Sequence, residues 1–213
     1  MTEIRDSDIA GNEVQDAAAL RILSHPMRIR ILGSLRQEGP ATATMLARRL
    51  GTDSGQTSFH VRMLHKGGFV EEEPNKGKGR ERWWRAASPS TTWRRPSELS
   101  EEVRFAFSEF ERAANLVWTQ LFEEYLRERS QWSPAWVDAA GSIDVWVRLT
   151  PERLRKLNQE IYETIRRYDL GDEEDADASD VVLLIHSFPR RSREGGPKPP
   201  IAGWYGFSTR EGD

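Results

Sequence analysis

The 213-residue chain contains no cysteine, which excludes disulfides and metal sites built from thiolates. It also lacks any run near the roughly 18 apolar residues that a membrane-spanning helix needs. Its first residues hold no signal-like apolar stretch, so we expect a soluble, cytoplasmic protein without a membrane partner. No nucleophile–base motif, phosphate-binding loop or HExxH motif is present. We therefore expect no catalytic residues, no metal and no cofactor.

The chain has slightly fewer basic than acidic residues, and an excess of positive charge is found in only one part of it. The whole sequence has a net charge of -3. Residues 20–90 hold thirteen Lys and Arg against six Asp and Glu, a net charge of +7. Residues 91–213 hold seventeen against twenty-three, a net charge of -6. A basic module joined to an acidic one is what a DNA-binding head with a separate regulatory body would produce.

Two short amphipathic helices joined by a tight turn are predicted within residues 41–68. In the first, Leu46 and Leu50 lie one helical turn apart, and Gly51 follows as a C-terminal stop. The second begins after cap candidates at residues 52–54. Its buried stripe recurs at spacings of four and three residues: Thr57, Val61 and Leu64. This is the helix-turn-helix arrangement that enters a DNA major groove.

The face opposite that stripe combines hydrogen-bonding, aromatic and cationic groups. Arg62 suits a guanine or a phosphate, Gln56 an adenine, and an outward Phe59 the methyl group of a thymine. His60 lies at the margin of the stripe, where packing or phosphate contact is a better reading than catalysis. His60 and His65 are five residues apart, so a metal pair is not expected. The DNA-binding residues predicted on this helix are Gln56, Ser58, Phe59, His60, Arg62 and Lys66.

A basic hairpin is predicted next. Residues 69–73 and 80–86 have the composition of short strands, and the Gly- and Asn-containing turn of residues 74–79 separates them. Cations on a hairpin beside a helix reach the phosphate backbone or the minor groove. The DNA-binding residues predicted on this hairpin are Lys76, Lys78, Arg80 and Arg82.

From residue 17 to residue 88 the chain closely resembles the ArsR-like winged-helix transcriptional regulators. The resemblance is carried by LSHPMRIRIL, TATMLARRLG and QTSFHVRMLHKGGFV, followed by the basic hairpin. It implies a homodimeric regulator that binds double-stranded DNA, usually as a repressor. Members of the family that sense metals typically use cysteines of the first helix of the pair or ligands on terminal helices. Because this chain has no cysteine, thiolate metal sensing is excluded.

We predict a mainly α fold with α+β elements. Its segments are a flexible arm (1–15), a winged helix-turn-helix domain (16–88), a linker (89–96), a long dimerisation helix (97–130), a small C-terminal α+β regulatory domain (131–189) and an irregular tail (190–213). The long helix is apolar on more than one side, so we expect it to pack against a second subunit and against its own C-terminal domain. Leu20 and Leu23, in a helix capped by Asp16, would pack on the winged-helix core or on that subunit. The dimerisation residues predicted are Leu20, Leu23, Phe107, Phe110, Val117 and Leu121.

The C-terminal domain is predicted as strand, helix, strand. Residues 143–149 alternate like a half-buried strand, a helix starts at Thr150-Pro151 and continues to Tyr168, and the apolar run 181–185 suits a more buried strand. The acidic residues 169–180 lack the spacing of a calcium loop and indicate a solvated connector. Four tryptophans are assigned first to packing. The sharper hypothesis is a pocket for a flat organic effector, formed by Trp118, Trp132, Trp136 and Trp146.

These features predict a homodimeric regulator whose two DNA-reading helices enter successive major grooves about 34 Å apart on a near-palindromic operator. A signal at the C-terminal half would change the affinity by coupling. The main alternative is a winged-helix adaptor that binds proteins and shows no salt-dependent DNA affinity. An enzyme in the C-terminal half has little support, because the only histidine there is His186 and no acid pair has a recognisable spacing.

Overall fold

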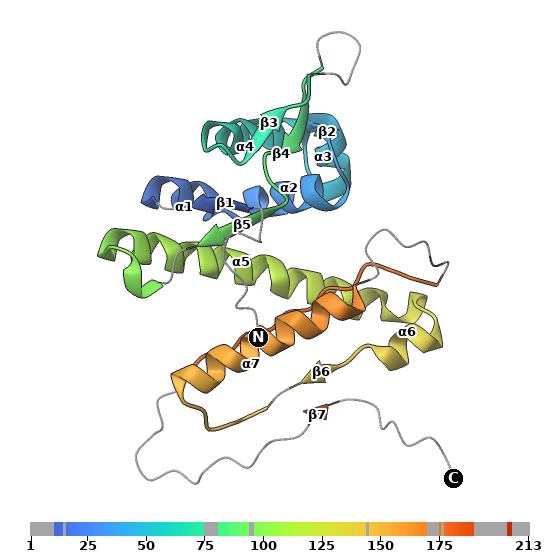
Figure 1. Cartoon of the computed structure of the whole chain (residues 1–213). Helices are drawn as coiled ribbons and strands as arrows, with labels where there is room; N and C mark the ends of the chain where they lie inside the picture. Colours follow the sequence, from blue (N-terminus) through green and yellow to red (C-terminus); the bar gives the residue numbers. More distant parts are fainter. Residues whose placement is uncertain are drawn as a thin grey trace. The chain divides into compact units, whose positions relative to one another are not determined.

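A computed structural model of the chain divides into two compact units, Met1–Leu126 and Arg127–Asp213, which are described separately (Figure 1). No helix in the described part of the chain combines the length and the apolar character that crossing a bilayer requires. The structure describes residues 11–14, 16–74, 81–93, 96–143, 145–169, 175, 177–189 and 204–205.

The first unit contains four short helices: α1 (Ala17–Leu23), α2 (Pro26–Gln37), α3 (Ala43–Leu50) and α4 (Ser54–Lys66). Local chemistry sets their ends. The carboxylate of Asp16 accepts a hydrogen bond from the amide of Ala19 at 2.7 Å, and that of Asp53 accepts one from the amide of Gln56 at 2.8 Å. Helix α3 stops at Gly51, whose φ of 63° is left-handed. The predicted helix-turn-helix is confirmed.

The predicted hairpin is confirmed as β3 (Val70–Glu72) and β4 (Trp83–Ala86), which pair antiparallel. A short strand that was not predicted, β2 (Ala41–Thr42), pairs with the other edge of β4 and gives the order β2-β4-β3. The hairpin tip, residues 75–80, lies outside the described residues. The first unit therefore contains a helix-turn-helix followed by a wing.

A second, two-stranded sheet differs from the prediction. Strand β1 (Gly11–Val14) pairs parallel with β5 (Ser90–Trp93), from Gly11 opposite Ser90 to Val14 opposite Trp93. The sequence predicted a flexible arm for the first segment and a linker for the second, and both predictions are wrong for these residues. Each strand exists because the other supplies its hydrogen bonds, and partners so distant in sequence leave no local pattern.

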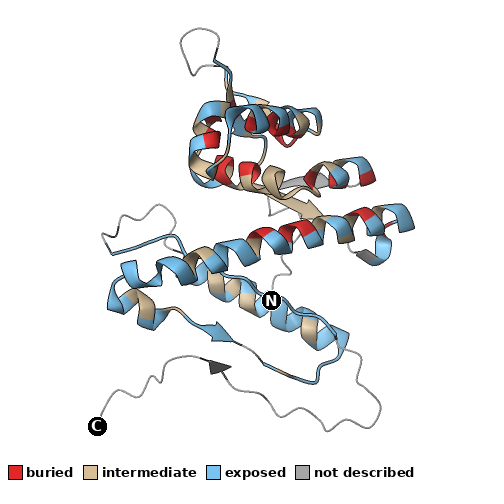
Figure 2. Cartoon of the chain, turned by 180° about the vertical axis from the view of Figure 1, so that it is seen from behind, coloured by how far each residue is buried: buried red, intermediate tan, exposed pale blue. Residues whose placement is uncertain are grey.

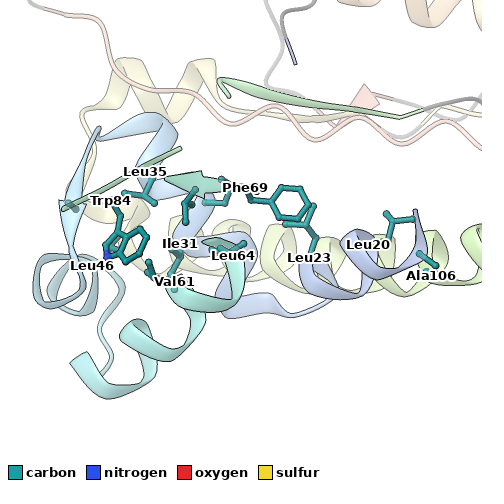
Figure 3. Close-up of a cluster of buried hydrophobic side chains, with 14 residues drawn as sticks. Leu20, Leu23, Ile31, Leu35, Leu46, Val61, Leu64, Phe69, Trp84 and Ala106 are labelled. Carbon is teal, nitrogen blue, oxygen red and sulfur yellow. The ribbon is translucent and has the colours of Figure 1, made fainter. Parts of the chain in front are cut away.

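A single apolar core holds the helices and the wing together (Figure 3). Ile31 of α2, Leu46 of α3 and Leu64 of α4 are fully buried, and Trp84 of β4 packs with them. Full burial of such side chains stabilises the fold by about 1.5–3 kcal/mol each. This core orients α4 within its unit.

Leu20 and Leu23 belong to the same core, with exposed fractions of 0% and 2%. They were predicted as dimerisation residues, with packing on the winged-helix core as the other possibility. The structure shows the second possibility, packing on the winged-helix core. The apolar stripe of this short helix is buried by the nearest apolar surface of its own unit. These two leucines have no surface left to offer to a second subunit.

The predicted long helix is confirmed as α5 (Glu101–Glu128), which follows the short 3-10 turn η2 (Pro96–Glu98). Its Ala106 is fully buried in the apolar core. The rings of Phe107 and Phe110 pack against Trp93 of β5, with centroids 5.5 and 4.8 Å away. The first turns of α5 are therefore part of the first unit.

The second unit contains η3 (Arg129–Gln131), α6 (Pro134–Ala139), β6 (Ser142–Ile143), α7 (Pro151–Tyr168) and β7 (Trp204–Tyr205). Strands β6 and β7 pair antiparallel. Helix α7 begins where it was predicted, because the hydroxyl of Thr150 accepts a hydrogen bond from the amide of Arg153 at 3.2 Å. The unit thus contains both helices and strands, as predicted.

The positions of its strands differ from the prediction. Of the first predicted strand, residues 143–149, only Ile143 lies in a strand, and residues 145–149 and 181–185 form none. Their apolar side chains are exposed or half-buried, and no residue within 127–143, 145–169 and 177–189 is buried (Figure 2). A strand needs a hydrogen-bonding neighbour, and within the described part of the unit neither segment pairs with one. Apart from β7, the predicted tail lies outside the described residues.

Candidate nucleic-acid interface

Helix α4 is fixed against α3 by one buried hydroxyl as well as by apolar packing. The Oγ1 atom of Thr57 donates a hydrogen bond to the carbonyl of Ala43 at 2.7 Å, at the first residue of α3. Thr57, Val61 and Leu64 all have an exposed fraction of 0%. Because this face is locked inward, the geometry of a helix turns the opposite face to solvent.

The outward face carries most of the side chains of this helix that were predicted to bind DNA. Gln56, Arg62 and Lys66 are exposed, and Phe59 is 55% exposed. The Nε atom of Arg62 donates a hydrogen bond to the carbonyl of Ser58 at 3.1 Å, which lays the arginine side chain along the helix. An amide, an aromatic ring and a guanidinium therefore lie at intervals of three residues on one helical face.

His60 does not share that exposure. Its exposed fraction is 8%, and its ring contacts those of His25, with centroids 4.5 Å apart, and Phe59, with centroids 5.3 Å apart. The prediction that His60 contacts DNA is corrected to packing, because the residue adjoins the buried stripe of α4. Burial, followed by the nearby charges of His25 and Arg28, lowers the pKa of His60.

His25 is a structural residue that the sequence analysis did not identify. It is the N-cap of α2, and its Nδ1 atom accepts a hydrogen bond from the amide of Met27 at 3.1 Å. Burial and then the charge of Arg28 lower the pKa of His25, although a hydrogen bond to its own backbone acts in the opposite direction. The signal that could have revealed it is Pro26 at the first helical position, which makes the preceding residue a capping candidate.

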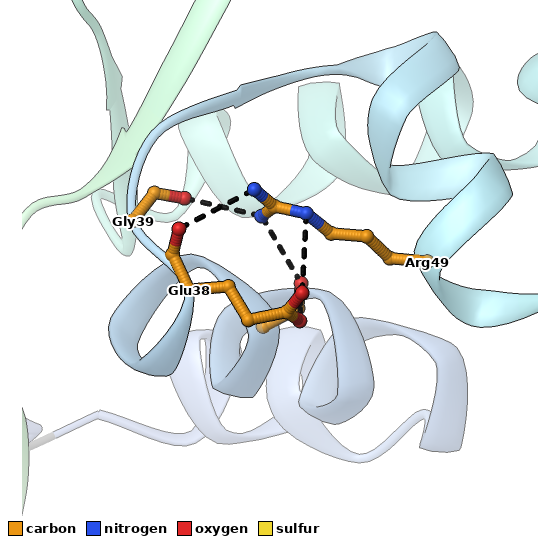
Figure 4. A network of polar contacts seen from close by, with 4 residues as sticks. Glu38, Gly39 and Arg49 are labelled. Carbon is orange, nitrogen blue, oxygen red and sulfur yellow. Dashed lines mark hydrogen bonds and ion pairs between the residues drawn. The ribbon is translucent and has the colours of Figure 1, made fainter. Parts of the chain in front are cut away.

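The junction between α2 and α3 depends on a second residue that was not predicted, Arg49 (Figure 4). Its guanidinium donates hydrogen bonds to the carbonyls of Gly39 at 3.2 Å and Glu38 at 3.3 Å, and its Nε lies 3.3 Å from a carboxylate oxygen of Glu38. The Nη1 atom of Arg49, which donates to Gly39, also donates a hydrogen bond to the hydroxyl of Ser34 at 3.4 Å. Arg49 therefore ties α3 to the end of α2.

Acidic residues accompany the described cations of the wing. Arg82 is exposed and lies 3.3 Å from a carboxylate oxygen of Glu72. Arg85 forms ion pairs with Glu71 at 2.7 Å and Glu73 at 3.3 Å. Arg82 is thus the described wing cation best placed for a phosphate. The other predicted wing contacts, Lys76, Lys78 and Arg80, lie outside the described residues.

The predicted dimerisation residues of α5 lie in different surroundings. Phe107 and Phe110 are half-buried, Val117 is buried, and Leu121 is 40% exposed. The most exposed apolar side chains of α5 are two others: Phe105, at 65%, and Leu116, at 57%.

Of the predicted effector residues, the structure brings Trp132 and Trp136 together, with ring centroids 6.1 Å apart in a T-shaped arrangement. Trp118 and Trp146 are half-buried. Within the described residues, no three side chains of His, Cys, Asp or Glu gather in a way that could hold a metal ion.

Comparison with known families places one domain in the chain. Residues 23–73 match the family model described as "Helix-turn-helix domain", which begins at the end of α1 and extends past β3. The matched residues are less than half of the chain and contain the face of α4 described above. The search of curated proteins found no match.

Several solved structures show a weak likeness to this chain. A "possible transcriptional regulatory protein (fragment 1-100)" from Mycobacterium bovis is 23% identical, with 46% of this chain and 89% of that chain covered and a TM-score of 0.31. NMB1585, a MarR family regulator from Neisseria meningitidis, is 14% identical, with 67% and 80% covered and a TM-score of 0.28. RV1404 from Mycobacterium tuberculosis is 18% identical, with 75% and 85% covered and a TM-score of 0.29.

Proposed function

We propose that this protein is a DNA-binding transcription regulator, in which α4 enters the major groove and the wing contacts the backbone. The observation that carries the proposal is the outward face of α4. It presents the exposed side chains of Gln56, Phe59 and Arg62 beside a fully buried stripe. An amide and a guanidinium suit the edges of adenine and guanine. The match of residues 23–73 to a helix-turn-helix family model supports the same reading.

Charge supports a nucleic-acid partner over a protein partner. The net charge of +7 belongs to residues 20–90, the segment that contains α4 and the wing. A basic surface of this kind attracts phosphates by releasing counterions, so binding should weaken steeply as salt is added.

The proposal includes a homodimer on a near-palindromic operator, with the two copies of α4 about 34 Å apart in successive major grooves. Exposed apolar side chains on α5 favour such a pairing. Phe105 and Leu116 are eleven residues, or about three turns, apart and therefore lie on the same face of the helix. Burying these large apolar groups against a second copy of the helix would stabilise the dimer, because it removes apolar surface from water.

We further propose that the regulator acts as a repressor of the ArsR-like type, with a small organic effector at the C-terminal half. The basis for the effector is the pair of Trp132 and Trp136, because Trp132 is 41% exposed and an exposed indole offers apolar surface to a flat organic molecule. Binding there would alter operator affinity through coupling between the two sites.

The decisive experiment uses the purified full chain and a random double-stranded DNA library. Selection should yield a two-fold symmetric site, and affinity for that site should fall steeply between 50 and 200 mM salt. Sedimentation on the selected DNA should show two protein copies per site. A chain that selects no sequence and has no salt-dependent affinity would exclude the proposal and favour the protein-binding adaptor.

A further inference from the structure

One side chain on the outward face of α4 cannot form hydrogen bonds to base edges. Phe59 is 55% exposed, although Val61 and Leu64 of the same helix are fully buried. It lies three residues from Gln56 and three from Arg62, and so in the middle of the proposed DNA-reading face. Exposing a phenyl ring to water costs free energy, and a partner that covers the ring recovers it.

The ring of Phe59 also packs against a neighbouring ring of its own helix. It makes an edge-on contact with the ring of His60, with centroids 5.3 Å apart and planes inclined by 73°. His60 is itself nearly buried and packs against His25 at the start of α2. A phenyl group braced in this way loses less side-chain freedom on binding than an unsupported one.

We infer that Phe59 reads the 5-methyl group of a pyrimidine in the major groove. The base edges in that groove present mainly hydrogen-bond donors and acceptors. The methyl group of thymine is an apolar feature among them, and a phenyl ring can cover it. Gln56 and Arg62, on either side, supply the polar contacts to neighbouring bases. This inference rests on the proposed function and adds the chemical group that determines specificity at one position of the site.

The same group has two sources in DNA. Thymine carries it in unmodified DNA, and 5-methylcytosine carries it at the same place on the base. A site read in this way therefore distinguishes thymine from uracil, and methylated from unmethylated cytosine, by one methyl group.

The experiment starts from the selected operator and compares the full-length wild type with Phe59→Ala. Each thymine is replaced by uracil in turn, which removes only the methyl group. At one position per half-site, the wild type should lose about fourfold in affinity, the factor expected for burial of one methyl-sized group. Phe59→Ala should bind the thymine and uracil forms equally at that position.

A second arm tests the other source of the methyl group. Cytosine is placed at that position with its paired guanine, and its unmethylated and 5-methylated forms are compared. The wild type should prefer the methylated form by about fourfold, and Phe59→Ala should show no preference. Phe59→Leu, which keeps an apolar side chain, should retain part of the preference in both arms.

Tyr162→Ala serves as a matched control, because Tyr162 is an exposed aromatic residue of α7, outside the DNA-reading face. It should show the wild-type methyl preference. The inference is overturned if the wild type and Phe59→Ala respond equally to every methyl removal while both bind DNA. If the wild type shows no salt-dependent DNA binding at all, the proposed function itself fails, and the two failures are thus distinguishable.

Discussion

The rings of His25 and His60 lie with their centroids 4.5 Å apart and their planes inclined by 42°. His25 caps α2 through its unprotonated Nδ1 atom, and His60 lies on the inner side of α4, next to Phe59. Arg28 is the other charged group that acts on both rings among the described residues. A proton on either ring would place positive charges side by side in a poorly hydrated place. The contact therefore couples the position of α4 to the uncharged state of two histidines.

The first prediction concerns stability against pH. The pKa values of His25 and His60 are lowered in the folded state, so the unfolded chain binds more protons below its own histidine pKa of about 6.5. The free energy of unfolding should be constant above about pH 6.5 and should fall as the pH decreases through the interval between 6.5 and the lowered values. Urea unfolding at pH 8, 7, 6 and 5 measures this dependence.

Two variants test the assignment. His60→Phe keeps an aromatic ring at the contact, and His25→Asn keeps a side-chain acceptor at the N-cap, but neither can be protonated. With either substitution, the free energy of unfolding should decrease less steeply as the pH falls below about 6.5. If the free energy of unfolding of both His60→Phe and His25→Asn decreases at acid pH as steeply as that of the wild type, other groups cause the decrease.

The second prediction concerns Arg49. Its planar guanidinium reaches two backbone carbonyls and the carboxylate of Glu38 at once, which a lysine ammonium cannot reproduce (Figure 4). Arg49→Lys should lower the free energy of unfolding by about 1–2 kcal/mol, since several hydrogen bonds are lost. The neighbouring Arg48 is exposed, so Arg48→Lys should change it by less than about 0.5 kcal/mol. Equal effects of the two substitutions in urea unfolding would contradict this role.

The third prediction compares two glycines with opposite expected signs. Gly51 ends α3 with a φ of 63°, where a Cβ atom is unfavourable, so Gly51→Ala should destabilise the fold by about 1 kcal/mol. Gly33 lies within α2, and beyond its chain neighbours and the backbone of its own helix no described atom comes within 4 Å of a Cβ built there. Gly33→Ala should therefore stabilise the fold by about 0.5–1 kcal/mol. Thermal unfolding measures both, and effects of the same sign would contradict the difference in backbone conformation.

The features that were predictable from sequence are those with local causes. Asp16, Asp53 and Thr150 cap the helices that their spacing indicated, and Gly51 ends α3 as expected. The inward stripe of α4 fixed its outward face, because both follow from one helical period. These elements include most of the candidate DNA-reading surface.

The features that were missed depend on partners distant in the chain. Strand β1 forms because β5 lies beside it, and the burial of His60 depends on the ring of His25. Residues 181–185 have the composition of a buried strand but are not paired within the described part of the unit. Composition alone therefore predicted a strand that the structure does not have there. Sequence periodicity tells which side of an element is apolar, but it does not tell which surface covers that side.

The last prediction separates base reading from backbone contact. Arg62 is exposed on the central face of α4, whereas Arg82 is an exposed cation of the wing, 3.3 Å from Glu72. Arg62→Ala should cost about 1–3 kcal/mol on the selected operator and relax discrimination at one base pair, because a guanidinium pairs with a guanine edge. Arg82→Ala should weaken binding to all sequences alike and reduce the slope of log affinity against log salt by about one.

Glu72→Gln provides a control of opposite sign for the wing. Because it removes the negative charge beside Arg82, it should strengthen binding to every sequence and steepen the salt dependence. Titrations of operator and scrambled DNA at three salt concentrations measure all three variants. If Arg62→Ala and Arg82→Ala lower operator and scrambled affinity by the same factor, Arg62 contacts phosphate, and the base-reading role assigned to α4 passes to Gln56 and Phe59 alone.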